Sequence, residues 1–171
     1  MPAQTPTDLA ADLLFLLNQA SFALATQMAS GLADLGISPR DYCVLMSASS
    51  GRWTQSQLAE MSHLDKTTMV VTIDKLERLG LAERQASHTD RRARVIAVTP
   101  AGEKTVAAAR KIVAELYDDV LGDLPAGKRK VFLDGLVRLV SGQLATPSHV
   151  DQPIRRRAPQ VPQTASSSRT R

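Results

Sequence analysis

Cysteine is almost absent from this chain of 171 residues. The one cysteine, Cys43, can form neither an internal disulfide nor a cysteine-based metal cluster by itself, which fits a reducing compartment. The three histidines, His63, His88 and His149, are far apart in the sequence, and none has a cysteine or carboxylate at ligand spacing. We therefore expect neither a metal site nor another cofactor.

Long apolar runs are missing as well. No stretch approaches the roughly 20 consecutive apolar residues that a membrane-spanning helix needs, and the N-terminal residues lack the basic and apolar regions of a secretion signal. The sequence also has no glycine-rich phosphate loop, no nucleophile elbow and no pair of metal sites. These absences predict a cytoplasmic protein that does not contact the membrane and is not an enzyme.

Positive charge is unevenly distributed along the chain. The formal net charge is +4 and the pI is about 9.6. Residues 147–171 contain five arginines and one acid, Asp151, and so account for the whole excess. This segment is rich in proline and serine and has little to bury, so we predict a disordered basic tail. The case for a nucleic-acid partner must therefore rest on local clusters of charge.

Apolar residues recur every three or four positions in several segments, the spacing of one helix face. Ser38 before Pro39 and Asp65 before Lys66 are typical helix caps, and Gly36 and Gly80 are typical terminators. The predicted helices cover residues 8–35, 39–48, 55–61, 66–79, 100–121 and 126–144.

A winged helix-turn-helix is predicted for residues 38–98. The helices at 55–61 and 66–79 are joined by a tight connection, and two short strands, 81–85 and 94–98, follow them. Counting Arg84, Arg91, Arg92 and Arg94 against Asp90 gives this hairpin a charge of +3. The predicted fold class is mainly α with a small β-hairpin wing (α+β).

Each part of this region has a predicted role on DNA. The helix after Asp65 presents side chains that can meet base edges and phosphates in the major groove, with its later cations on the backbone. A guanidinium on the wing can enter the minor groove, with Arg92 the first candidate, and Asp90 can hold an arginine extended. The predicted contacts are Lys66, Thr67, Thr68, Thr72, Lys75 and Arg78 on the helix, and Arg91, Arg92 and Arg94 on the wing.

The first and last helices carry long leucine-rich stripes. The first stripe has no folded element before it in the sequence, so it must pack on later elements or on another chain. The length of these stripes favours pairing, so we predict that residues 8–35 and 100–144 form a homodimer. Closure of a single monomeric core is the alternative, because periodicity alone cannot assign a partner. The dimerisation candidates are Leu9, Leu13, Leu16, Phe132, Leu136, Leu139 and Val140.

Two sequence runs resemble the MarR family of bacterial regulators. The first continues from Leu64-Asp65-Lys66-Thr67-Thr68-Met69 to Gly80-Leu81, and the second extends from Asp90 to Gly102. Asp90 and Arg92 match the Asp-x-Arg signature of the wing, and Val98-Thr99 with Gly102 matches the end of its last strand. The resemblance covers about residues 8–144. We therefore predict one MarR-like domain over residues 1–146, followed by the tail.

The resemblance implies a function as well as a fold. It implies a homodimer whose terminal helices intertwine, a palindromic double-stranded DNA operator, repression as the usual mode, and often a small phenolic effector that releases DNA. A bacterial regulator of this kind would associate with the nucleoid. Many members have Thr-Arg on the recognition helix where this chain has Val70-Val71, which shifts weight to Lys66, Thr67 and Thr68.

Three further interpretations stay open at this stage. The candidates to line an effector cleft are Phe15, Phe22, Tyr42 and Trp53, although a tryptophan placed like Trp53 is more often a packing residue. Cys43 is a candidate redox sensor, but its place in an apolar helix favours a buried, inert thiol. The alternative to a ligand-responsive regulator is a winged-helix module that binds protein, or binds DNA nonspecifically, without an effector.

Overall fold

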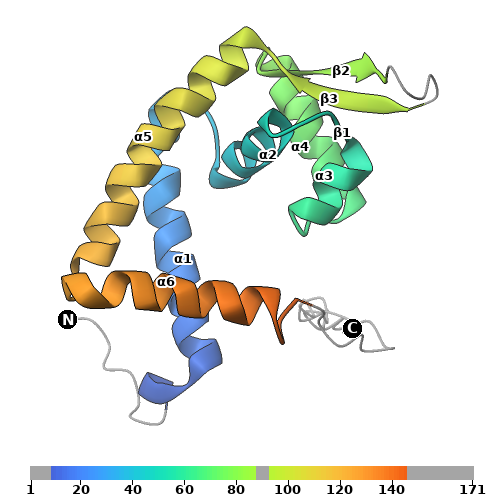
Figure 1. The fold of residues 1–171 in the computed structure, drawn as a ribbon. Helices are drawn as coiled ribbons and strands as arrows, with labels where there is room; N and C mark the ends of the chain where they lie inside the picture. Colours follow the sequence, from blue (N-terminus) through green and yellow to red (C-terminus); the bar gives the residue numbers. More distant parts are fainter. Residues whose placement is uncertain (1–8, 88–92, 146–171) are drawn as a thin grey trace, which may run out of the picture. The chain divides into compact units, whose positions relative to one another are not determined.

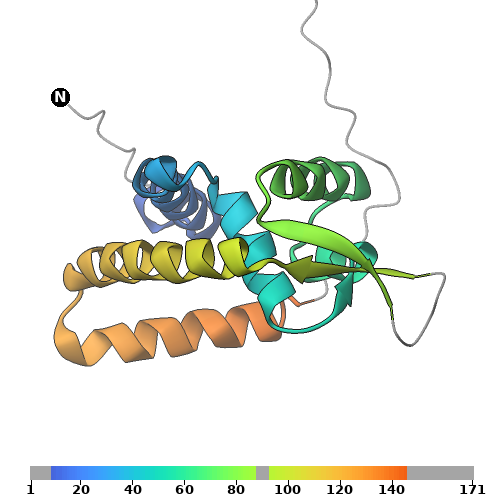
Figure 2. The same ribbon diagram turned by 90° about the horizontal axis from the view of Figure 1, so that it is seen from above.

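The computed structural model describes residues 9–87 and 93–145. It comprises six α-helices and a small antiparallel sheet, which confirms the predicted fold class (Figures 1 and 2). The chain divides into two compact units, residues 1–124 and residues 125–171, which we describe separately. Among the described residues, none of the helices has the length and apolar character required to cross a bilayer.

The N-terminal segment is broken where the sequence predicted one continuous helix. A 3₁₀ turn, η1 (Leu9–Ala11), precedes α1 (Leu13–Gly31), and a second turn, η2 (Ala33–Leu35), follows it. The Asp12 carboxylate accepts a hydrogen bond of 2.7 Å from the backbone N–H of Phe15. This cap starts α1 at Leu13 because it satisfies an N–H group that has no partner within the helix.

The next two helices begin with reciprocal caps. At the start of α2 (Pro39–Ser49), the Asp41 backbone N–H donates to Ser38 Oγ over 3.2 Å, and the Asp41 carboxylate accepts from the Ser38 N–H over 2.7 Å. Thr54 and Gln57 form the same arrangement at α3 (Gln55–Met61). Both helices therefore start where the sequence predicts.

A tight turn joins α3 to α4 (Lys66–Arg78), and these two helices make the helix-turn-helix. His63 adopts a left-handed conformation with φ of 50° in this turn. The turn closes as the backbone N–H of Leu64 donates to the Ala59 carbonyl over 2.9 Å. Gly80, also left-handed at φ of 68°, follows α4 as the sequence predicts.

The sheet has three strands in the order β1-β3-β2. The hairpin consists of β2 (Ala82–Ala86) and β3 (Arg94–Val98), paired so that Arg84 faces Ile96. The sequence missed β1 (Trp53–Thr54), which pairs with the other edge of β3. Two residues are too few to show the alternation that reveals a strand.

The hydrophobic core of the first unit lies between α2, α3, α4 and the sheet. Its most deeply buried side chains come from all of these elements and include Val44, Leu45, Leu58, Met69, Ile73, Leu76 and Ile96. The helix α5 (Pro100–Gly122) contributes Val106, Ala109 and Val113, and α1 contributes Met28. The winged-helix region therefore closes its own core within one chain.

A close approach joins the end of β3 to the turn after α4. The Thr99 hydroxyl donates to the Gly80 carbonyl over 2.6 Å and accepts from the Gly102 N–H over 3.0 Å, which caps α5. A Cβ atom at Gly102 would lie 2.0 Å from the Leu81 carbonyl oxygen, so no larger residue fits without rearrangement. The Val98-Thr99 and Gly102 motif is thus explained by packing between the turn after α4 and the start of α5.

The second unit contains the helix α6 (Ala126–Ser141). It ends at Ser141, three residues before the predicted boundary at Leu144. Just after this end, the Gly142 backbone N–H donates to the Leu139 carbonyl over 3.3 Å. None of its residues is buried. An exposed stripe that includes Phe132, Leu139 and Val140 runs along it.

Candidate nucleic-acid interface and effector region

One face of α4 is buried and the opposite face is exposed. Met69, Ile73 and Leu76 form the buried face. Thr67, Val71, Asp74 and Arg78 follow one another at intervals of four, three and four residues, which places them in one exposed row. Lys66 and Val70 are exposed beside this row. The predicted contacts Lys66, Thr67 and Arg78 therefore share an accessible face of the recognition helix.

Two of the predicted threonine contacts are occupied in holding α4 together. Asp65 Oδ1 accepts from the Thr68 backbone N–H over 2.9 Å, and Oδ2 accepts from the Thr68 hydroxyl over 2.6 Å. The side-chain hydrogen bond from Thr68 is the largest cause that lowers the pKa of Asp65. The Thr72 side chain is buried, and its hydroxyl donates to the Thr68 carbonyl over 2.8 Å. Its place in the core corrects the expectation that Thr72 faces DNA.

Lys75 forms an ion pair with Asp41 of α2. Asp41 is 3% exposed, and the same carboxylate also accepts from the Ser38 backbone N–H. A charge that is almost fully buried needs such partners, since removing water from it is costly. Lys75 therefore joins the recognition helix to α2, a structural role that the sequence analysis did not assign to it.

Arg84 of β2 clamps the base of the hairpin to α4. Its guanidinium donates to Asp74 Oδ1 over 2.7 Å and forms an ion pair with Glu77, while the Gln55 side chain accepts over 3.2 Å. The Arg84 backbone N–H also donates to Glu77 over 2.9 Å. These bonds connect β2, α3 and α4, which lie together in Figure 1. Arg84 therefore fixes the wing against the recognition helix.

The net charge of the wing is smaller than the +3 predicted from the sequence. That count omitted Glu83, so the hairpin between Leu81 and Val98 carries four basic and two acidic residues. Acidic partners on α4 also offset the charge of Arg84. Arg94, at the start of β3, is exposed. Asp90, Arg91 and Arg92 lie outside the described residues.

The four aromatic residues predicted for an effector cleft differ in their surroundings. On α1, Phe15 is half-buried and Phe22 is 73% exposed. Trp53 pairs with Ile96 in the sheet, and its indole N–H donates to Ser50 Oγ over 3.0 Å. Packing in the sheet accounts for Trp53. Tyr42 is buried on α2, and its burial together with the charges of Tyr117, Arg110 and Cys43 affects its pKa.

A polar and aromatic group, which we call the Tyr42 cluster, lies where α2 meets α5. It consists of Tyr42, Cys43, Met46, Arg110 and Tyr117. Burial raises the pKa of Tyr42, Tyr117 raises it further, and the positive charge of Arg110 opposes both. The Arg110 guanidinium donates to Met46 Sδ over 3.0 Å. Sequence analysis missed Arg110 and Tyr117, although their spacing of seven residues places them on one side of α5.

Cys43 departs from the sequence expectation. Its side chain is exposed on α2, where we expected it to be buried. Desolvation by the surrounding atoms still raises the pKa of its thiol and so disfavours the reactive thiolate. Desolvation therefore favours an unreactive thiol, as we expected, but on an exposed side chain.

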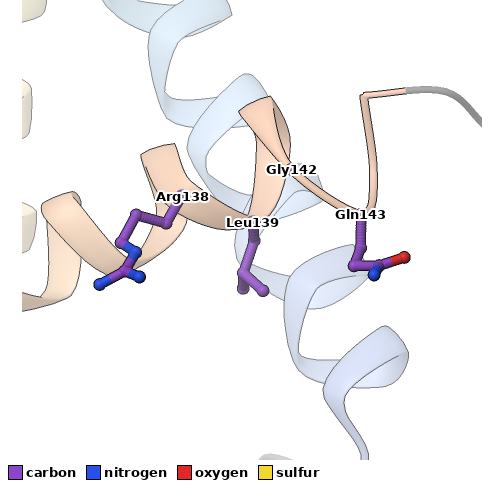
Figure 3. Close-up of a pocket in the computed structure, with 4 residues that line it drawn as sticks. All are labelled: Arg138, Leu139, Gly142 and Gln143. Carbon is purple, nitrogen blue, oxygen red and sulfur yellow. The ribbon is translucent and has the colours of Figure 1, made fainter.

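The predicted dimerisation residues mostly leave apolar surface open to solvent. Leu136 is half-buried, and the other members are exposed: Leu9, Leu13, Leu16, Phe132, Leu139 and Val140. A hollow of about 590 Å³ lies at the end of α6, lined by Arg138, Leu139, Gly142 and Gln143 (Figure 3). It includes one dimerisation candidate, Leu139, and none of the four aromatic candidates. Among the described residues, no cluster of three or more potential metal ligands occurs.

Comparisons with known proteins bear on this arrangement. The MarR family model matches residues 37–93. A protein assigned as the transcriptional regulator of the hcr operon of Thauera aromatica is 29% identical over 144 residues, covering 83% of this chain and 87% of that protein. CouR from Rhodococcus jostii RHA1, solved with p-coumaroyl-CoA, is 26% identical, with a TM-score of 0.71 and coverage of 87% of this chain and 100% of CouR. CouR bound to a 23-mer DNA duplex is 23% identical and shares the fold, with a TM-score of 0.72 and coverage of 82% and 99%.

Proposed function

Because this chain belongs to the MarR family of DNA-binding transcriptional regulators, which are not enzymes, we propose that it is a ligand-responsive repressor acting as a homodimer on a palindromic operator. The observation that carries the DNA-binding part of this proposal is the exposed face of α4. It presents Lys66, Thr67 and Arg78 on a helix whose other polar side chains are engaged in a cap, a hydrogen bond to the helix backbone or ion pairs.

The recognition helix enters the major groove in this proposal. Lys66 and Thr67 lie in its first turn, where the helix dipole favours phosphate and where short side chains reach base edges. Arg78, three turns further on, binds the phosphate backbone and sets the register. Thr68 supports this arrangement through its hydrogen bonds to Asp65 rather than through DNA.

The wing enters the minor groove. Arg94, exposed at the start of β3, is a described side chain that supports this role. Arg92 and Arg91 complete the contact, with Asp90 holding one of them extended, on the evidence of the sequence. Arg84 keeps the hairpin at a fixed angle to α4, so that both grooves are engaged together.

Two copies pair through the terminal helices. Exposed leucine and phenylalanine side chains on α1 and α6 are a surface that a second copy could bury, and apolar burial is the main favourable term in association. The two recognition helices must then sit about 34–36 Å apart to enter successive major grooves on one side of the DNA. We propose that the dimer works in the cytoplasm on the nucleoid.

An effector binds at the Tyr42 cluster. Arg110 and Tyr117 offer a cation and a phenol beside the buried Tyr42, which suits an aromatic ligand with a negative group. The p-coumaroyl-CoA in the CouR structure is a ligand of this chemical class. Because α2 packs against α5, a ligand between them could change the spacing of the recognition helices and release the operator.

Selection of bound duplexes from random DNA, at a stated near-physiological salt, tests the DNA-binding part. We expect enrichment of a palindrome whose half-sites lie about one helical turn apart. Binding without enrichment, abolished by modest salt, would instead favour a nonspecific module. Absence of duplex binding at low salt would favour a wing that binds protein.

Titration of the operator complex with p-coumaroyl-CoA, and with p-coumarate as the smaller probe, tests the effector part. If either probe binds at the Tyr42 cluster, it should lower operator affinity, and operator DNA should lower probe affinity by the same factor. Arg110→Gln should weaken the probe more than the operator. Simultaneous binding with unchanged affinities would refute mutual exclusion for these probes.

A further inference from the structure

The recognition helix has an apolar side chain where the fold does not need one. Val71 is 61% exposed, although Met69, Ile73 and Leu76 on the opposite face have no exposed surface. Valine is a weaker helix former than alanine because its branched side chain loses rotamer freedom. Neither helix propensity nor core packing therefore accounts for Val71.

The neighbours of Val71 define its surroundings. It follows Thr67 by one helical turn and precedes Asp74 and Arg78 in the exposed row of α4. Val70, 39% exposed, lies at the edge of this row. Val71 is therefore an apolar position between Thr67 and Asp74, whose charge is paired with Arg84, on the face that the proposed function places in the major groove.

Only one base offers apolar chemistry in that groove. The C5-methyl group of thymine is the apolar group on the major-groove edges of the four base pairs, which otherwise present hydrogen-bond donors and acceptors. A valine cannot read those donors and acceptors. It can gain free energy by burying a thymine methyl group and its own methyl groups away from water.

We propose that Val71, with Val70 beside it, selects thymine in each operator half-site by packing against the 5-methyl group. This inference rests on the proposed DNA-binding function and deepens it. Thr67 and Arg78 position the helix on either side of the contact, and Val71 supplies a preference for A·T pairs at the step that it faces. The half-site therefore contains thymine at one or two positions whose methyl groups matter more than their hydrogen bonds.

Replacement of thymine by deoxyuridine in the selected duplex tests this inference. Deoxyuridine keeps the base pair and the O4 acceptor and removes only the methyl group. Each half-site thymine is replaced in turn, and thymines in the flanking DNA serve as controls. We expect affinity to fall about fourfold for each contacted methyl group, and to stay unchanged at the flanking positions.

The variant Val71→Ala separates a direct contact from an effect of the methyl group on DNA shape. Alanine is a better helix former and the site is exposed, so this variant should fold with an unchanged thermal midpoint. It should bind the thymine duplex more weakly and bind the thymine and deoxyuridine duplexes equally, which is the non-additivity expected of two groups in contact.

The outcomes separate failure of the thymine contact from failure of the proposed DNA-binding function. Specific binding that is indifferent to every methyl group would overturn the thymine contact and leave the repressor proposal standing. The same loss on deoxyuridine in the wild type and in Val71→Ala would also overturn it, because the methyl group would then act without Val71. A protein that enriches no duplex would overturn both proposals.

Discussion

The winged-helix region and the terminal helices differ in how far they bury their apolar side chains. In the first, residues from α2, α3, α4 and β3 enclose one another, and several side chains have no exposed surface. In α6, no residue is buried, and α1 buries only Met28. The contrast teaches that the DNA-reading part is completed within one chain, whereas the terminal helices present apolar surface that one chain leaves open.

The largest effect is expected from damage to the closed region. Leu45→Ala removes a fully buried side chain between α2 and its neighbours and leaves a cavity, so the free energy of unfolding should fall by about 2–5 kcal/mol. Unfolding in urea measures this change in free energy. The matched control is Leu14→Ala on the exposed side of α1, which should change the free energy of unfolding of a single chain by less than about 0.5 kcal/mol. Equal losses of unfolding free energy in the two variants would contradict the difference in burial between the two regions.

A change to the open surface should alter assembly rather than fold. Phe132 is 47% exposed on α6, and Phe132→Glu places a charge in the proposed dimer contact. Light scattering should show the mass of two chains for the wild type and of one chain for the variant at micromolar concentration. Circular dichroism should show retained helix. A variant that keeps the mass of two chains would exclude Phe132 from the interface.

A smaller effect is expected where the wing joins α4. Arg84→Gln removes the ion pairs to Asp74 and Glu77, so stability should fall by about 1 kcal/mol and operator affinity should fall with it. If Arg84 positions the wing and does not touch phosphate, the slope of log affinity against log salt should stay unchanged. A slope smaller by about one unit would show a direct phosphate contact.

The smallest effect concerns the start of the recognition helix. The hydrogen bonds from Thr68 hold the pKa of Asp65 below its ordinary value of 3.8. The folded state therefore favours the carboxylate, and this stabilisation is present above pH 3.8 and is lost as pH falls through the lowered pKa. Asp65→Asn keeps a cap but does not titrate, so its thermal midpoint should lose less than that of the wild type between pH 5 and pH 2.5.

Sequence reasoning located elements with strong local signals. The caps Ser38, Thr54, Asp65 and Thr99 and the terminators Gly36 and Gly80 determine helix ends through hydrogen bonds between near neighbours, so the sequence predicts them well. It failed where distant residues decide. The strand β1 exists only through pairing with β3. The cap at Asp12, a local signal that was overlooked, broke the predicted first helix.

The candidate site divides in the same way. Spacing alone is enough to place Thr67 and Arg78 on one face of α4, and both were predicted contacts. The roles of Lys75 and Arg84 depend on partners 34 and 10 residues away, Asp41 and Asp74. The sequence therefore assigned Lys75 to DNA and counted Arg84 only as part of the positive charge of the wing. Thr72 is polar, so its sequence predicted an exposed side chain. In the structure it lies on the buried face of α4, beside the apolar residues of that face.

The mass of the protein on its selected operator, measured by light scattering on the full palindrome and on a single half-site, tests the central claim most directly. The account predicts two chains on the palindrome, and affinity for the isolated half-site lower by at least tenfold because only one recognition helix is then engaged. One chain per duplex, bound equally well to the palindrome and to the half-site, would contradict a dimeric regulator whose terminal helices join two complete winged-helix regions.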